Sequence, residues 1–108
     1  MKTILTRDEI LALLATVEDP EIGLNIVDLG LVYALDVSDT QIALRLLFTA
    51  QACPLRQLIA QWTLDLLTAR AAQTVAIAIE EEAVWTPDRL TPAGREALGY
   101  AAPATTPV

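Results

Sequence analysis

Apolar residues recur at helical spacing near the start of this chain, directly after a helix-start signal. Thr6 and Glu9 are three residues apart, as in a capping box, in which each side chain accepts a hydrogen bond from an amide at the helix start. We therefore predict a first helix from about Arg7 to Val17. The apolar residues of this helix are Ile10, Leu11, Leu14 and Val17.

Alternating apolar residues then predict a β-hairpin. Large apolar side chains alternate along residues 31–37 and again along 42–48, and a polar Ser-Asp-Thr turn lies between the two runs. Residues 18–23 contain a proline, a glycine and three carboxylates, so we predict a turn there that continues as a loop to Gly30.

In the second half of the chain, apolar residues again occur first at helical spacing and then in alternation. Helical spacing over about residues 55–71 predicts a helix of four to five turns, and Trp62 is assigned to its buried face. Alternation over 75–79 predicts a third strand, parallel to the second through a right-handed crossover. Thr91 caps a short last helix that ends near Leu98. The predicted apolar face of the long helix comprises Leu55, Leu58, Ile59, Trp62, Leu66 and Ala69.

These elements predict an α+β fold. It is a two-layer sandwich of order α-β-β-α-β-α, with the helices on one face of a small mixed sheet. The chain has 108 residues, of which 54% are hydrophobic, so it has ample material for one packed core. We expect a single domain over residues 1–100 and a flexible tail over 101–108.

Charge and hydropathy exclude some classes of partner. The formal net charge is −7 and there is no basic cluster, which argues against binding to nucleic acid. No apolar stretch approaches the roughly 20 residues of a membrane span, and the first residues do not resemble a secretory signal. We therefore expect a cytoplasmic protein that binds neither nucleic acid nor membrane.

Cys53 is the only cysteine, and the chain has no histidine. It lies between the second predicted strand and the long helix, where free amides of a helix start can face it. One interpretation is a small buried hydrophobe. The helix dipole favours a thiolate by only about 0.3–1 kcal/mol, and no histidine base is available, so we expect no enzyme activity. A metal deprotonates a thiol outright, which favours Cys53 as a metal ligand.

Two carboxylates and one hydroxyl are the candidate oxygen groups near Cys53. Asp19 and Glu21 flank Pro20 in a rigid turn, which is ordinarily only a solvated turn. If the fold brings this turn next to Cys53, the carboxylates would assist the capture of a cation. Thr49 follows the second strand, where its hydroxyl would either donate to a bound sulfur or close the loop.

Other polar groups are expected to be structural. Asp28 is assigned to capping a turn rather than to binding a metal. The run Glu80–Glu82 is interpreted as a solvated edge that discourages strand pairing. Trp85, Pro87 and Arg89 are expected to hold the last helix against the body, with Arg89 as a partner for a carboxylate.

Three separated blocks of sequence resemble a known family. They are residues 19–33, which begin Asp-Pro-Glu-Ile-Gly; residues 49–54, which end Cys-Pro; and residues 85–91, which read Trp-Thr-Pro-Asp-Arg-Leu-Thr. In this order they are similar to the metal–sulfur cluster biosynthesis family, the MIP-eighteen family domain, which includes SufT-like proteins and the PaaD-like subunit of phenylacetate degradation. The resemblance implies a small α+β domain that assembles or delivers iron–sulfur clusters. It implies Cys53 as the metal-binding cysteine, with Asp19, Glu21, Thr49 and Pro54 in supporting positions.

The resemblance therefore implies an iron–sulfur cluster assembly or carrier factor. One thiolate cannot supply the four ligands of a cluster. A cluster would be held transiently, bridged between subunits or with a client, and the isolated protein would otherwise carry none. The expected partners are client apo-proteins, other assembly factors and a second copy in a homodimer. The alternative is a metal-free protein–protein adaptor for assembly machinery or an oxygenase complex.

Overall fold

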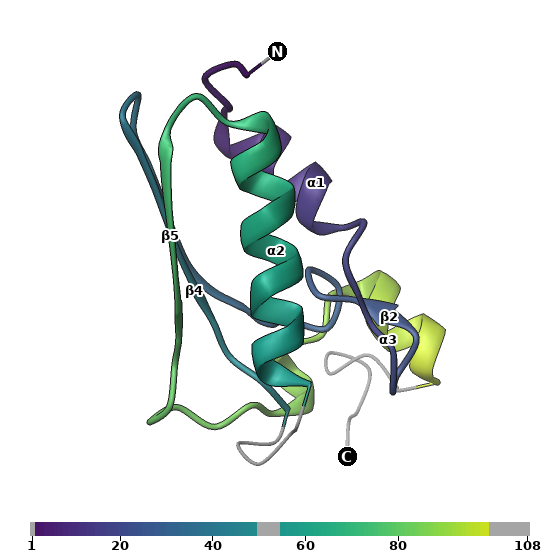
Figure 1. Cartoon of the computed structure of the whole chain (residues 1–108). Coiled ribbons are helices and arrows are strands. Elements are labelled where there is room, and N and C mark those ends of the chain that lie inside the picture. Colours follow the sequence, from purple (N-terminus) through teal and green to yellow (C-terminus); the bar gives the residue numbers. More distant parts are fainter. Residues whose placement is uncertain (1, 50–54, 100–108) are drawn as a thin grey trace.

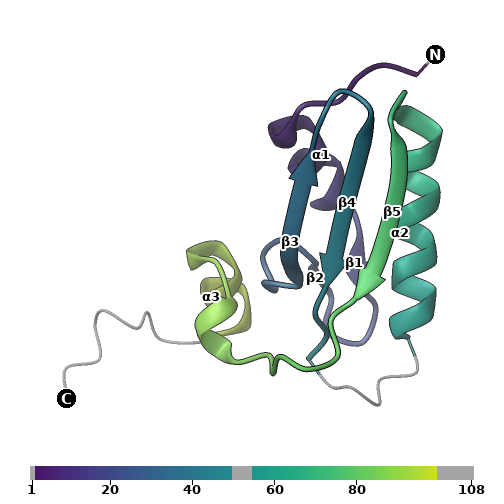
Figure 2. The same cartoon turned by 90° about the vertical axis from the view of Figure 1, so that its left-hand side faces the viewer.

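A three-stranded sheet with helices on one face forms the body of the protein (Figure 1). The computed structural model describes residues 2–49 and 55–99. Two helices lie against one face of the sheet (Figure 2), which confirms the predicted α+β fold. The strands are β3 (Val32–Val37), β4 (Gln41–Leu46) and β5 (Thr74–Ile79), and the helices are α1 (Arg7–Leu14) and α2 (Arg56–Arg70).

The sheet has the predicted mixture of strand directions. β3 and β4 form an antiparallel hairpin in which Val37 pairs with Ile42. β4 and β5 are parallel, with Ile42 opposite Val75 and Leu46 opposite Ile79. α2 connects these two strands. Their parallel pairing confirms the prediction of a parallel third strand.

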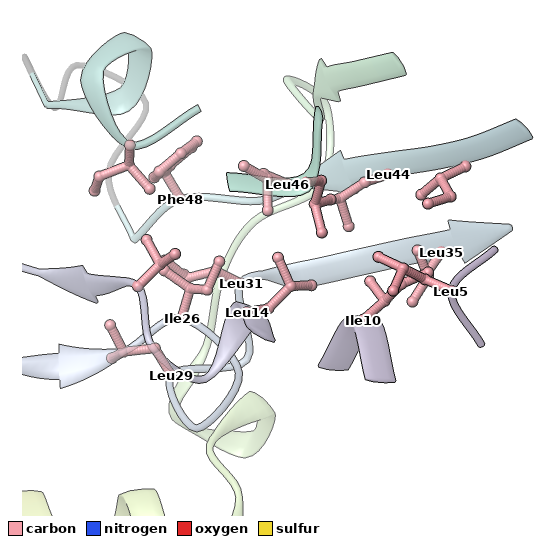
Figure 3. Close-up of a cluster of buried hydrophobic side chains, with 14 of the residues drawn as sticks. Leu5, Ile10, Leu14, Ile26, Leu29, Leu31, Leu35, Leu44, Leu46 and Phe48 are labelled. Atoms are coloured by element: carbon pink, nitrogen blue, oxygen red, sulfur yellow. The ribbon is translucent and has the colours of Figure 1, made fainter. Parts of the chain in front are cut away.

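The core lies between the sheet and the two helices (Figure 3). Alternate residues of β4 point toward the helices, and Ile42, Leu44 and Leu46 are buried while Arg45 is exposed. Ile10 and Leu14 of α1 are completely buried. These two residues are four apart in the sequence and therefore lie on the same side of the helix, which is its buried side. The capping box that starts α1 is present, with both reciprocal hydrogen bonds formed by Thr6 and Glu9.

α1 is shorter than predicted, and two short strands follow it. The helix ends at Leu14 instead of Val17, because the amides of Thr16 and Val17 bond to the carbonyls of Leu13 and Leu14 in a tighter turn. The Val17 carbonyl then accepts the amide of Ile26 at 2.9 Å. The segment predicted as turn and loop accordingly contains an antiparallel pair, β1 (Glu18–Asp19) and β2 (Leu24–Asn25).

The buried side of α2 agrees with the predicted one only in part. Ile59 is fully buried and Leu55 and Leu66 pack against the core, whereas Leu58, Trp62 and Ala69 of the predicted face are exposed. Ile59, Thr63 and Leu67 form its fully buried row, and the Thr63 hydroxyl donates to the Ile59 carbonyl at 2.8 Å. Leu58 and Trp62 are each 41% exposed, so the assignment of Trp62 to the core is wrong. Apolar residues occupy more than one side of this helix, and the sheet covers only the side that carries Ile59.

The C-terminal segment forms the predicted short helix. A 3-10 turn, η1 (Pro87–Arg89), precedes α3 (Pro92–Leu98), which lies to one side of the start of β3 (Figure 2). The Thr91 hydroxyl accepts the amide of Gly94 at 3.1 Å, and Gly99 ends the helix with φ of 80°.

Candidate functional site

Cys53 belongs to the connection between β4 and α2. The strand ends at Leu46 and the helix begins at Arg56, as the sequence predicts for a strand-to-helix corner. Cys53 and Pro54 lie outside the described residues, as does the predicted tail 101–108. Thr49, the last described residue before Cys53, is partly exposed. The roles assigned to Cys53, Pro54 and Thr49 therefore stay predictions.

The first turn of α2, which follows Cys53 in the chain, presents amide groups that have no acceptor within the helix. The ladder of helical hydrogen bonds begins with the Ile59 amide, which donates to the Leu55 carbonyl at 2.9 Å. The amides of residues 56–58 precede it, and amides in the first turn of a helix have no acceptor within the helix. This end of α2 therefore carries the positive end of the helix dipole.

An ion pair links the start of α2 to the segment that follows β5. Arg56 Nη1 lies 3.1 Å from Glu81 Oε1, and the Arg56 side chain is 20% exposed. Sequence reasoning did not identify Arg56 as part of this region. The available signal was a basic residue in the first turn of a helix, which is unfavourable for the dipole and indicates a nearby anionic partner.

The acidic run after β5 is partly used to hold the local fold. The Glu80 carboxylate accepts the amides of Glu82 at 3.0 Å and Ala83 at 3.1 Å, and it lies 3.3 Å from Arg45 Nη1. The hydrogen bond from the Glu82 amide, followed by that from Ala83, lowers the pKa of the Glu80 carboxyl below its usual value. Glu81 and Glu82 are exposed at the edge, as predicted.

The turn between β1 and β2 separates the two candidate carboxylates. Asp19 is only 3% exposed, and its Oδ1 accepts the Glu21 amide at 2.9 Å. Its carbonyl also accepts the amide of Gly23 at 2.7 Å. Glu21 is exposed. The turn therefore holds Asp19 in a fixed, buried position and leaves Glu21 available at the surface.

This turn lies beside the middle of α2. Pro20 lines the same surface hollow as Trp62 and Leu66 of that helix. Trp62 comes six residues after Arg56, which corresponds to about 9 Å along the helix axis. The two segments that the sequence singles out, the acidic turn and the helix preceded by Cys53, are thus neighbours in the fold.

Asp28 has a structural role in joining two distant segments. Its carboxylate accepts Asn25 Nδ2 at 2.8 Å and the Thr91 hydroxyl at 2.7 Å. Its carbonyl also accepts the Thr91 amide at 3.1 Å. These contacts connect the loop before β3 to the start of α3.

Replacing Asp28 by alanine is expected to destabilise the protein. The change leaves the partly buried Asn25 amide and Thr91 hydroxyl without their acceptor, which costs about 1–3 kcal/mol. Urea denaturation of the wild type, Asp28→Ala and a control, Asp39→Ala at an exposed turn, measures this effect. Equal unfolding free energies for the two variants would contradict the assigned role.

Trp85 and Arg89 hold the C-terminal segment against the body, as predicted. Trp85 Nε1 donates to the Leu29 carbonyl at 2.7 Å. Arg89 Nε donates to the Gly30 carbonyl at 2.8 Å, and its guanidinium carbon lies 5.4 Å from the centre of the Tyr33 ring. The partners of Arg89 are therefore carbonyls and an aromatic ring, whereas the sequence suggested a carboxylate.

Among residues 2–49 and 55–99, no group of three or more Cys, Asp or Glu side chains is placed to hold a metal ion. Within the same ranges, no helix is both long enough and apolar enough to span a membrane.

Comparison with known proteins identifies relatives of similar length. The model of a family described as "Iron-sulfur cluster assembly protein" matches residues 7–84. A protein of Porphyromonas gingivalis named "Fe-S protein maturation auxiliary factor" is 31% identical over 97 residues, which cover 88% of this chain and 92% of the relative.

Solved structures share the fold. A domain of unknown function from Bacillus anthracis has a TM-score of 0.77 and 25% identity, and the match covers 85% of this chain and 90% of that one. A conserved hypothetical protein from Thermotoga maritima has a TM-score of 0.76 and 30% identity, covering 92% and 99% of the two chains. A Mycobacterium tuberculosis protein associated with Fe-S complex assembly and repair has a TM-score of 0.52 and 33% identity, covering 94% and 97%.

Proposed function

This chain belongs to the iron–sulfur cluster assembly protein family, and on that premise we propose that it is a carrier that delivers clusters to client apo-proteins through Cys53. In this proposal it acts in the cytoplasm as a maturation factor and not as an enzyme. The cluster is its cargo. The known family supports a role in cluster maturation, and the use of one cysteine for delivery is the part that we add.

The chemistry of a single thiol supports transient carriage. A cluster requires about four ligands, and this chain contains one cysteine and no histidine. The remaining ligands would come from a second copy of the chain, from small thiols or from the client itself. Such shared ligation favours release to a client with several cysteines, because the client can supply the thiolate ligands that this chain lacks.

The observation that carries the proposal is the setting of the Cys53 connection. It joins β4 to the amide-bearing start of α2, and the acidic turn lies beside the middle of the same helix, at Trp62 and Leu66. Amide groups at a helix start stabilise a thiolate or a bound sulfide, while the exposed Glu21 carboxylate attracts an iron cation. Thr49 would add a hydroxyl on the strand side, and buried Asp19 would hold Glu21 in place through its hydrogen bond to the Glu21 amide.

Anaerobic reconstitution with ferrous iron and sulfide tests this proposal. The wild type is expected to develop the visible absorption of an iron–sulfur cluster, alone or with a cysteine-containing apo-ferredoxin, and Cys53→Ser is expected to lose it. Ala69→Ser, on the exposed surface of α2, is the control and should behave as the wild type. Equal absorption by Cys53→Ser and the wild type would overturn delivery through Cys53.

A further inference from the structure

An apolar row on α2 remains at the surface. Leu58, Trp62 and Leu66 follow one another at intervals of four residues, so they lie on one side of the helix. Leu58 and Trp62 are each 41% exposed, and Leu66 is partly buried. The α2 region beside α1 and the segment leading to β2 can be followed in Figure 1.

Two residues of this row, Trp62 and Leu66, form one wall of a hollow. Trp62 and Leu66 face the end of α1 and the start of β1, and the hollow is defined by Thr16, Val17, Glu18, Pro20, Trp62 and Leu66. We call this hollow the Trp62 groove. A tryptophan that is left two-fifths exposed beside a proline is typical of an anchor at a protein–protein contact, because its large ring contributes much apolar area at little cost in side-chain entropy.

Acidic residues lie on the elements that form the Trp62 groove. Glu18 lines it, Asp65 directly precedes Leu66 on α2, and Glu21 lies on the neighbouring turn; all three side chains are exposed. The next position of the apolar row is Arg70, which lines a different hollow together with Glu9. The groove therefore has one carboxylate in its lining and two more on the elements that form it, and it would attract a partner with basic residues beside an apolar segment.

We propose that the Trp62 groove docks an apolar segment of a partner protein that is flanked by lysine or arginine residues. A second copy of this chain fits less well, because it would bring the same carboxylates and a net charge of −7 against the same charges. An anionic membrane is disfavoured for the same reason. The inference rests on the proposed function only for the identity of the partner, a client or another assembly factor.

The two tryptophans of the chain allow a direct test in the intact protein. In ¹H–¹⁵N correlation spectra, the exposed Trp62 indole is the reporter, and the Trp85 indole, which donates to the Leu29 carbonyl, is the internal reference. The probe is an amphipathic 14-residue peptide of leucine and lysine, and its control is the same peptide with glutamate in place of lysine. The lysine peptide is expected to shift the Trp62 signal in a saturable manner and to leave Trp85 unchanged.

Variants then distinguish specific binding in the Trp62 groove from non-specific hydrophobic binding. Affinities of the variants are measured by calorimetric titration, because Trp62→Ala lacks the reporter indole. Trp62→Ala is expected to weaken binding of the lysine peptide at least tenfold. The matched control is Tyr33→Ala, another aromatic residue that is 41% exposed but lies on β3, and it should change the affinity less than twofold. Replacing Glu18 and Asp65 together by lysine should reverse the preference in favour of the glutamate peptide.

Other results would overturn the inference. Equal binding of the two peptides, or equal losses in Trp62→Ala and Tyr33→Ala, would show no selective groove. Concentration-dependent dimers in sedimentation experiments that disappear in Trp62→Ala would assign the groove to a second copy instead. Cys53→Ser separates this inference from the proposed function, since it should bind the lysine peptide as the wild type does while losing the cluster absorption.

Discussion

Gly30→Ala is expected to reduce the free energy of unfolding by about 3–5 kcal/mol, as the sum of backbone strain and steric overlap. Gly30 has φ of 74°, a conformation that residues with a Cβ rarely adopt. An added Cβ would overlap the Arg89 carbonyl oxygen and lie 2.6 Å from its carbonyl carbon. Because this neighbour is backbone, it cannot move aside as a flexible side chain could.

Gly30→Ala should also loosen the packing of the C-terminal segment, η1 and α3, against the body. The Gly30 carbonyl accepts the Arg89 Nε at 2.8 Å, so a shift at this position also weakens the contact that holds η1. Gly23→Ala is the matched control, since Gly23 has φ of 78° but nothing lies within 4 Å of its added Cβ. It should lose only about 1 kcal/mol, the cost of the left-handed backbone alone.

Urea denaturation followed by circular dichroism measures both glycine variants. The difference between their unfolding free energies gives the cost of the overlap at Arg89. If Gly30→Ala were no less stable than Gly23→Ala, the close approach of the two backbone segments would be refuted.

Ile59→Ala is expected to cost about 2–5 kcal/mol, the range for removing a large buried aliphatic side chain. Ile59 is completely buried on the side of α2 that faces the sheet. Its loss leaves a cavity under the first half of the helix that follows Cys53, so the start of α2 should be held less firmly against the sheet.

The adjacent residue provides the control for Ile59. Leu58 is 41% exposed, and Leu58→Ala should cost less than about 1 kcal/mol because most of the removed surface already contacts water. Thermal unfolding of the two variants under identical conditions compares them. A larger loss for Leu58→Ala than for Ile59→Ala would contradict the exposed position of Leu58 and the buried position of Ile59 in the structure.

The contrast between these two residues explains how far sequence reasoning reached at α2. The helix itself was predicted within a residue or two, because helical spacing and the proline before it are local signals. Apolar residues stand on two sides of the helix, however, and spacing alone does not say which side the sheet will cover. Trp62 was placed in the core for that reason and lies instead at the surface.

At the candidate site, too, the sequence indicated some features and gave no information on others. The sequence indicated the acidic turn, the strand-to-helix corner and the family, and the family is confirmed. It gave no sign that Asp19 is buried while Glu21 is exposed, because that difference depends on the packing of the turn against α2. The placement of the Cys53 sulfur relative to this turn stays a prediction.

By itself the sequence determined the order of the main helices and strands, the capping of α1 and α3, the hairpin and the parallel third strand. These features follow from interactions between residues close in the chain and from the rule that a strand-helix-strand unit returns parallel. Only the tertiary structure decided the buried side of α2, the Trp62 groove and the joining of Gly30 to Arg89 across 59 residues. Such contacts depend on how whole elements fit together, and no local spacing in the chain specifies that fit.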